Sequence, residues 1–485
     1  MNLLQVALLI PVAGAVLIVL ARQHPALRDT LVLATATLLF AAVAALAPAV
    51  FNGAHPTLLL AEPLPGLALQ LTVEPLGMLF ALLASLLWVI TSIYSIGYMR
   101  ALQERHLARF YSCFALSLWA AMGMAFAGNL LTLFVFYEIL TLVTYPLVTH
   151  AGTERAQRSG RVYLGLLLGT SIGFLLLAIV WTWQLAGTLD FTAGGILRGT
   201  ASPLLLGILL ALYAFGIGKA ALMPFHRWLP AAMVAPTPVS ALLHAVAVVK
   251  GGVFFMLKVT VYVFGIDLLA ELQATQWLLY VAAATILLAA LVALRQDNLK
   301  LRLAYSTISQ LSYIVLGALL ANAAGIMGAA MHIATHAFGK ITLFFCAGAI
   351  LVSTRKTRVS ELAGLGRSMP WTMGAFAIAS LAMIGLPPTA VFVSKWYIIL
   401  GAVDAGQMLA VAVLLLSTLL TAGYLLPVVY TAFFEAPREP GSDTHGEAPP
   451  TILLALGVTT LGTLVLFFFP DIPLALARQL AGLAA

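Results

Sequence analysis

The sequence predicts an all-α, polytopic membrane protein, and three observations lead to this fold class. First, 62% of the 485 residues are hydrophobic and only 8% are charged, whereas about 25% of the residues of soluble domains are charged. Second, apolar runs of about 20 residues, long enough to span a bilayer core, recur from one end of the chain to the other. Third, most Lys and Arg residues gather in the short segments between these runs.

About fourteen apolar runs have the length of a membrane span. The first, MNLLQVALLIPVAGAVLIVL, lacks a basic leading segment and a small-residue cleavage pattern, so we expect a span and not a signal peptide. Pro224 and the pair Pro387–Pro388 interrupt the seventh and twelfth runs. The predicted spans are residues 3–20, 30–50, 75–98, 110–127, 129–149, 161–186, 203–223, 238–263, 274–293, 301–321, 324–352, 371–400, 406–434 and 450–470.

The positions of the 24 Lys and Arg residues predict the orientation. Alternate loops, beginning with the first, hold 17 of them, the opposite side holds only Arg198 and Arg478, and five lie within spans. Because cytoplasmic loops are enriched in Lys and Arg, the first set of loops is predicted to be cytoplasmic. Both termini are then expected on the outer (periplasmic) side of a cell inner (plasma) membrane. The polar stretch EAPREPGSDTHGEAPP, residues 435–450, becomes a flexible cytoplasmic connection.

The composition argues against two other functional classes. The net charge of +7 is distributed over short loops and not along one stripe, which argues against nucleic-acid binding. The two cysteines, Cys113 and Cys346, lie in apolar spans and cannot supply the four thiolates of an iron–sulfur cluster. We therefore expect no cofactor in this chain.

Five lysines and at least one acid fall within predicted spans, where an ionisable side chain is costly and usually functional. Glu138 lies mid-span in LLTLFVFYEILTLVTYPLVTH, and its expected partner is Lys219 in YAFGIGKAALMPFHRWLP. The alternatives are a structural ion pair or a protonated carboxyl group. Lys250 is also expected near mid-span, where Gly251–Gly252 permits a distortion or close packing just after it. Lys258 lies nearer the outer end and could extend to the membrane surface.

A second polar pattern occurs in MHIATHAFGKITLFF, where His332, His336 and Lys340 are spaced i, i+4, i+8. These residues form one helical stripe about 12 Å long. We interpret it as a titrating stripe bridged by water, because the pKa of histidine lies near neutrality. A satisfied core histidine pair and a zinc site are the alternatives, but no third ligand occurs nearby in the sequence, and we expect no metal.

The two interrupted spans, five apart in order, each carry one lysine beside the break: Lys219 and Lys395. Interrupted segments at corresponding positions in two halves indicate repeated units with an ion site between them. Because each unit has five spans, the second is expected to be inverted relative to the first. Residues 1–109 then hold the first three spans, 110–263 the first repeat, 274–434 the second repeat, and 435–485 the cytoplasmic connection and the final helix.

Five segments resemble the antiporter-like subunits shared by respiratory complex I, energy-converting membrane hydrogenases and Mrp-type multisubunit cation/proton antiporters. The likeness covers nearly the whole chain. Lys395 is more similar to the D subunit of the Mrp antiporters and to some complex I subunits than to the complex I subunit with glutamate there. The segments are FYEILTLVTY, GKAALMPFHRWLPAAMVAPTPVSALLHAVAVVKGG, RLAYSTISQLSYIVLG, HIATHAFGKITLFF and GLPPTAVFVSKWYIILGA.

The resemblance implies a proton-transfer role for each matching residue. Glu138 and Lys219 would form a paired switch, Lys250 a connecting lysine, and Lys395 the terminal lysine. The rest of the implied set comprises His244, which matches a family histidine, and the stripe His332, His336 and Lys340. By contrast, Tyr305, Ser306 and Ser309 match a motif that we interpret as structural, for helix packing and capping.

Three functions remain open at this level. The chain is predicted to be the proton-conducting membrane subunit of a multisubunit monovalent cation (Na⁺)/proton antiporter. The alternative is a proton-pumping membrane-arm subunit of a complex I-like NADH:quinone oxidoreductase or energy-converting membrane hydrogenase. A non-conducting structural subunit is the third. In each case we expect no catalytic site in this chain, other membrane subunits as partners, and protons and possibly Na⁺ as the transported ions.

Overall fold

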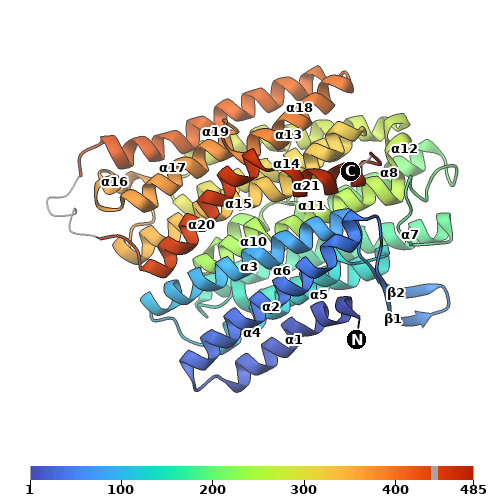
Figure 1. Ribbon diagram of the computed structural model, residues 1–485. Helices are drawn as coiled ribbons and strands as arrows, with labels where there is room; N and C mark the ends of the chain where they lie inside the picture. Colours follow the sequence, from blue (N-terminus) through green and yellow to red (C-terminus); the bar gives the residue numbers. More distant parts are fainter. Residues whose placement is uncertain (1, 438–445, 484–485) are drawn as a thin grey trace.

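A computed structural model describes residues 2–437 and 446–483, except for the side chains of Leu64 and of residues 243–245. Figure 1 shows helices lying side by side in one elongated bundle, with the N-terminal helices along one edge and α17 to α19 along the other. Both termini lie at the same end of this bundle (Figure 1). The prediction of an all-α membrane protein is confirmed.

Ten helical segments in the described part of the chain are long and apolar enough to cross a membrane. Each coincides with one of the predicted spans. They are α1 (Leu3–Leu20), α2 (Pro25–Phe51), α3 (Pro75–Ala101), α4 (Leu107–Ala125), α5 (Leu130–Val148), the continuous run of α6 (Glu154–Thr170), η1 (Ser171–Leu175) and α7 (Leu176–Ala186), α13 (Gln273–Arg295), α15 (Ala323–Thr354), α19 (Met408–Phe434) and α20 (Pro450–Phe468).

The other four predicted spans are also helical, although three of them consist of more than one piece. The exception is α14 (Leu299–Leu319), which is continuous. The pieces are α8 (Pro203–Gly216) with the short turn η2 (Gly218–Ala220), then α10 (Thr237–Ala245), α11 (Val248–Lys258) and η4 (Val259–Phe264), and finally α17 (Pro370–Ile384) with α18 (Ala390–Asp404). Short connecting elements are α9 (Trp228–Ala231), η3 (Ala232–Val234), α12 (Ile266–Glu271), η5 (Val359–Glu361) and α16 (Leu365–Ser368).

Both predicted helix breaks occur, although the first begins at residue 217, before the predicted end of the span at residue 223. Helix α8 ends at Gly216, ahead of Pro224, and α17 ends at Ile384, ahead of Pro387–Pro388. A proline lacks the amide hydrogen that an α-helix needs and its ring clashes with the preceding turn. Each break leaves helix-end backbone groups inside the bundle, which protein must cover because no water is present in the bilayer core.

A third break, between α10 and α11, was not predicted at its observed position. The sequence suggested a distortion or close packing at Gly251–Gly252, but α11 runs through both glycines, and the helix is interrupted earlier, at Val246–Ala247. Neither residue is a helix breaker by type. Residue type therefore does not explain this break, and the glycines lie inside the helix, where Gly252 packs against the backbone of η2.

Two further elements were missed by the sequence analysis. Strands β1 (Thr57–Leu64) and β2 (Leu67–Thr72) form an antiparallel hairpin, for which Pro65-Gly66 was the available turn signal. Helix α21 (Asp471–Leu480) follows the final span and packs against α3 and α15. Both elements lie at the end of the bundle that carries the termini (Figure 1).

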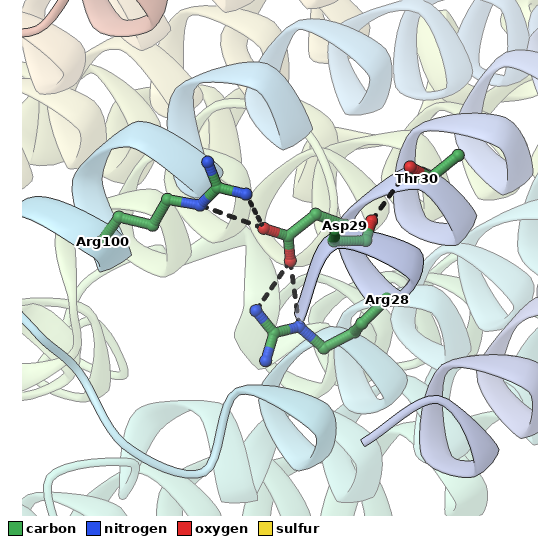
Figure 2. A network of polar contacts seen from close by, with 5 residues as sticks. Arg28, Asp29, Thr30 and Arg100 are labelled. Atoms are coloured by element: carbon green, nitrogen blue, oxygen red, sulfur yellow. Dashed lines mark hydrogen bonds and ion pairs between the residues drawn. The ribbon is translucent and has the colours of Figure 1, made fainter. Parts of the chain in front are cut away.

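A buried carboxylate, that of Asp29 near the start of α2, joins this helix to the last turn of α3. Figure 2 shows Asp29 between the guanidinium groups of Arg28 and Arg100. Nη2 of Arg28 lies 2.7 Å from one carboxylate oxygen of Asp29, and Nη2 of Arg100 lies 2.6 Å from the other. These residues lie in helix ends and not in the connecting loops. The ion pair between Asp29 and Arg100 therefore links two spans, while both arginines also contribute to the positive charge of the predicted cytoplasmic side.

Candidate functional site

The first break brings Lys219 to helix α5. The lysine lies in η2 and is fully buried. Its Nζ donates hydrogen bonds to the carbonyl oxygen of Tyr137 at 2.7 Å and to Oγ1 of Thr141 at 2.6 Å. The ammonium also lies 3.1 Å from the centroid of the Tyr137 ring, a cation–π contact. The partners of Lys219 are therefore neutral groups.

Glu138, the predicted partner of Lys219, lies on α5 between Tyr137 and Thr141 in the sequence. Both of its carboxylate oxygens are buried, and neither receives a hydrogen bond from the described residues. Within the same residues, no ion pair joins Lys219 and Glu138 at 4.0 Å or less. Lys219 and Glu138 therefore lie on neighbouring elements, but the ammonium group of the lysine contacts Thr141. An ion pair between Lys219 and Glu138 stays a prediction.

A glycine on α11 allows Lys219 to approach the second lysine's helix. A Cβ atom on Gly252 would lie 2.4 Å from the carbonyl carbon of Lys219 and 2.3 Å from the amide nitrogen of Ala220. No side chain fits in that space, because these neighbours are backbone atoms. The backbone of Lys219 therefore packs against α11 at Gly252, which lies two residues after Lys250 in the sequence.

Lys250 joins the first half of the bundle to the central helix α15. It is fully buried, and its Nζ lies 2.8 Å from Nδ1 of His336. The ring of His336 stacks on that of His332, with centroids 5.6 Å apart and planes 20° apart. Nε2 of His336 is buried and has no hydrogen-bond partner among the described residues. The two halves of the predicted site are thus in direct contact.

His332 continues the line toward the last break. Its Nδ1 lies 2.8 Å from Oγ of Ser394, the residue next to Lys395, and its Nε2 lies 3.1 Å from Oε1 of Gln310. The ring of Tyr313 stacks on that of His332, with centroids 5.7 Å apart. The same tyrosine ring lies 4.9 Å from Nζ of Lys395. Tyr313 and Ser394 therefore bridge the histidine pair and the terminal lysine.

Lys395 closes the broken end of α17. Its Nζ donates to the carbonyl oxygens of Met383 at 3.0 Å and Ile384 at 2.9 Å. These are the last two residues of that half-helix, whose carbonyls have no partner within the helix. A lysine beside the proline break thus satisfies the acceptors that the break exposes.

Lys340 lies on a side branch of the line. Its Nζ donates to Oγ of Ser306 at 2.7 Å, and the hydroxyl of Tyr424 donates to the same oxygen at 2.9 Å. Ser306 was interpreted as structural, yet it contacts a predicted site residue. Ser309 fits the packing interpretation, because its Oγ donates to the carbonyl of Ile286 on α13. The side chain of His244, also predicted for the site, lies outside the described residues.

The zinc alternative for the histidine pair finds no support in the described part of the chain. No group of three or more His, Cys, Asp or Glu side chains is placed there to hold a metal ion. Both ring nitrogens of His332 already have hydrogen-bonding neighbours, Ser394 and Gln310. The arrangement instead contains lysine, imidazole and hydroxyl groups, side chains that are chemically able to bind a proton or to reorient a hydrogen bond.

Several contributors to the site were missed by sequence reasoning. Thr141, Gln310, Tyr313 and Ser394 are ordinary polar residues of apolar spans, and only their neighbours in space give them a role. A weak sequence signal for two of them was available, since Gln310 lies in the segment RLAYSTISQLSYIVLG and Ser394 in the segment GLPPTAVFVSKWYIILGA. The expectation that Lys258 could extend to the membrane surface is wrong, because it is fully buried and forms an ion pair with Glu74, which is not among the predicted site residues.

The fold and these contacts define an antiporter-like class of polytopic membrane protein, in which buried lysines and histidines connect broken helices. The chain belongs to the NADH:quinone oxidoreductase/Mrp antiporter transmembrane family, whose family model matches residues 127–421. The matched region contains every predicted site residue. The resemblance inferred from the sequence is thereby confirmed.

Relatives in this family come from complexes of different kinds. NADH-quinone oxidoreductase subunit N of Desulforudis audaxviator is 34% identical over 425 residues, which cover 84% of this chain and 83% of that protein. The A/B subunit of a probable K(+)/H(+) antiporter of Rhizobium meliloti is 29% identical over 412 residues, 82% of this chain and 40% of that protein. Hydrogenase-4 component B of Escherichia coli is 30% identical over 426 residues, 82% of this chain and 62% of that protein. The last two relatives are thus considerably longer than the region they share with this chain.

Solved structures share the fold over almost the whole chain. A chain of the archaeal membrane-bound sulfane sulfur reductase has a TM-score of 0.87 at 24% identity, covering 99% of this chain and 97% of that one. A chain of the Mrp complex from Dietzia sp. DQ12-45-1b has a TM-score of 0.87 at 22% identity, with the same coverage. At such identities the likeness establishes the fold alone.

Proposed function

We propose that this chain conducts protons through the buried line of Lys219, Lys250, His336, His332 and Lys395. The observation that carries the proposal is the direct contact from Lys250 to His336, from His336 to His332, and through Tyr313 and Ser394 to Lys395. Ionisable groups inside a membrane are costly and are usually retained for transport. A line of them across the two halves of a bundle is what a proton path requires.

The switch at the start of this line is Lys219 with Glu138. When the lysine moves toward the carboxylate, its positive charge is partly compensated and a proton on Lys250 is less destabilised. When the lysine turns away, its charge favours proton release from Lys250, because like charges repel strongly where the dielectric constant is low. Lys219 contacts Thr141 and not Glu138, which supports the state in which the lysine is turned away from the carboxylate.

For the host complex, we propose a multisubunit monovalent cation/proton antiporter that exchanges protons for Na⁺ in a cell membrane. The Rhizobium relative carries the description of a K(+)/H(+) antiporter component, and a chain of the Dietzia Mrp complex has the same fold. Other membrane subunits are then the partners of this chain, and both termini face the periplasm.

A redox-driven proton pump is the second candidate, and one observation favours it. The NADH-quinone oxidoreductase subunit N relative aligns over 83% of its own length, so the two chains share nearly their whole extent. In that host, the same lysines would be driven by a reaction in other subunits. The buried line is common to both candidates and does not distinguish them.

Purification from native membranes in mild detergent, followed by mass spectrometry of the associated proteins, separates the two hosts. Small hydrophobic subunits and a larger relative of this chain are expected for an antiporter, and everted vesicles should then show cation-dependent collapse of a pH gradient. Soluble subunits with iron–sulfur or nickel centres would overturn the antiporter assignment. Unchanged proton movement in a Lys219→Ala or Glu138→Ala variant would overturn conduction itself.

A further inference from the structure

The end of the bundle that carries both termini contains a cavity of about 690 Å³. Charge distribution predicts this end to be the outer one. Residues of the hairpin, the start of α3, the turn η4 and the C-terminal segment line the cavity. Its wall includes Glu74, whose carboxylate forms an ion pair with the fully buried Lys258. An ionisable pair therefore lies between solvent-accessible space and the interior of the bundle.

Glu74 lies at the N-cap position of α3, where Ser, Thr, Asp and Asn are the side chains that commonly accept hydrogen bonds from the first backbone amides of the helix. Glu74 makes no such capping bond and pairs with Lys258 instead. Rings of Phe191 and Tyr262 surround the lysine, with centroids 4.5 Å and 4.9 Å from its Nζ. A buried ion pair is a poor device for stability, since desolvation offsets most of the attraction.

Helix α11 connects this pair to the proton line. Lys250, Phe254 and Lys258 are spaced i, i+4, i+8, so they lie on one face of the helix, with the lysines about 12 Å apart along its axis. Phe254 stacks on Phe80 of α3, with ring centroids 5.0 Å apart, and both rings are fully buried. Two aromatic rings therefore separate the cavity and its ion pair from Lys250.

We propose that Glu74 is the outer proton-exchange group of the line, and that the Phe80–Phe254 pair is the barrier between it and Lys250. Lys258 is a positioning residue, whose ion pair with Glu74 holds that carboxylate at the wall of the cavity. When the two rings separate and admit water, a proton leaves the Lys250 ammonium, crosses by that water and protonates the Glu74 carboxylate. Glu74 then releases the proton to water in the cavity. This inference rests on the proposed function, because it gives the line its outlet.

The variants Glu74→Gln, Lys258→Met and the double variant test the proposal, with proton movement measured in vesicles of the intact complex. If the pair is only structural, the double variant leaves no lone buried charge and should transport better than either single variant. If Glu74 exchanges protons, the double variant should stay inactive like Glu74→Gln, with transport reduced by at least about tenfold, as for loss of a positioned proton-transfer group. Asp267→Asn is the matched control, since this acid lines the same cavity but pairs with Arg198 at the surface, and its transport should be unchanged.

Two further measurements separate the possible failures. In a Cys113→Ala/Cys346→Ala background, Ala193→Cys at the cavity should react with a membrane-impermeant thiol reagent added to intact cells. Reaction only in everted vesicles would overturn the outward direction. If Lys250→Met blocks transport while Glu74→Gln does not, the outlet is elsewhere and only this inference fails. Normal transport in Lys250→Met would remove the proposed function together with its outlet.

Discussion

The five lysines inside the spans differ in the charge of their hydrogen-bond partners. Lys219, Lys340 and Lys395 donate to carbonyl or hydroxyl oxygens, and Lys250 contacts an imidazole. Lys258 alone has a carboxylate partner within 4.0 Å among the described residues. A carboxylate partner favours the charged lysine, whereas neutral acceptors stabilise it far less. Lys258 therefore differs from the other four lysines in having a charged partner, whereas the other four have neutral ones.

At the scale of single residues, we predict that Lys250→Met abolishes proton movement, because it removes the hydrogen bond between Lys250 of α11 and the His336 imidazole. Lys250→Arg should also be inactive, since a guanidinium keeps its proton at every accessible pH. Vesicle transport at equal amounts of inserted protein measures both variants. The control is Lys356→Met in the loop after α15. Wild-type transport by Lys250→Arg would show that a fixed charge is sufficient.

At the scale of elements, the helix breaks decide where the lysines lie. The break after α8 allows η2 to pack on α11, and the one after α17 provides the carbonyl groups that Lys395 contacts. One glycine on α11, Gly252, makes the first of these arrangements possible. Gly252 faces the backbone of η2, whereas Gly251 faces the flexible end of Met124, with a Cβ–Cε distance of 3.0 Å.

These two neighbouring glycines give a matched pair of variants. Gly252→Ala should displace η2 and Lys219, lower the stability by about 1–3 kcal/mol as overpacking does, and impair transport although every ionisable residue remains. Gly251→Ala should be tolerated, because the methionine side chain can move. Thermal unfolding in detergent and vesicle transport measure the two effects. Equal behaviour of the two variants would contradict the role of this contact.

A latch between the segment before α14 and the turn after α15, at the end of the bundle predicted to be cytoplasmic, gives a pH prediction. Burial alone raises the pKa of Asp297, but hydrogen bonds from the amide and hydroxyl of Ser360 outweigh it and lower the pKa. Amides of Arg358 and Thr357 likewise lower the pKa of Glu361. A depressed carboxyl pKa stabilises the folded state above the unfolded pKa, near 4 for these acids, and this contribution is lost as pH falls through the folded pKa.

We therefore expect the melting temperature of the purified protein to decrease when the pH is lowered below about 4. This decrease should be smaller in the Asp297→Asn variant. Both acids are exposed, so the difference should correspond to less than about 1 kcal/mol. Asp404→Asn, which changes an exposed acid at the C-terminal end of α18, is the control. Identical pH profiles for the wild type and Asp297→Asn would show that the latch contributes nothing.

At the scale of the whole molecule, the bundle separates its two ends by charge. The loops predicted to be cytoplasmic hold 17 of the 24 Lys and Arg residues. The opposite end carries the hairpin, the termini and the cavity beside Glu74 (Figure 1). The direction of the proposed outlet therefore depends on the orientation of the bundle in the membrane.

Reporter fusions test this orientation. Alkaline phosphatase fused after Ala485 should be active, because the enzyme folds only outside the cytoplasm, and a fusion after Glu435 should be inactive. A fluorescent protein that folds only in the cytoplasm should give the opposite pattern at the same positions. A reversed pattern would place the termini and the cavity in the cytoplasm.

The sequence by itself determined the membrane-spanning class, the positions of the spans and the residue types at the site. These follow from local properties: apolar runs of bilayer length, prolines that break helices and charges that are costly in lipid. Lys219, Lys250, His332, His336 and Lys395 could be selected on that basis alone, because ionisable residues stand out in apolar spans.

Only the tertiary structure decided which of these groups touch one another. Contacts between Lys250 and His336, or between His332 and Ser394, join residues 86 and 62 positions apart in the chain, and no periodicity records them. The break at Val246–Ala247 and the turn of Lys219 toward Thr141 likewise depend on packing between helices. The role proposed for Glu74 likewise depends on the tertiary structure. An acid at the start of a helix is common, and only the fold places the buried Lys258 of another span beside it.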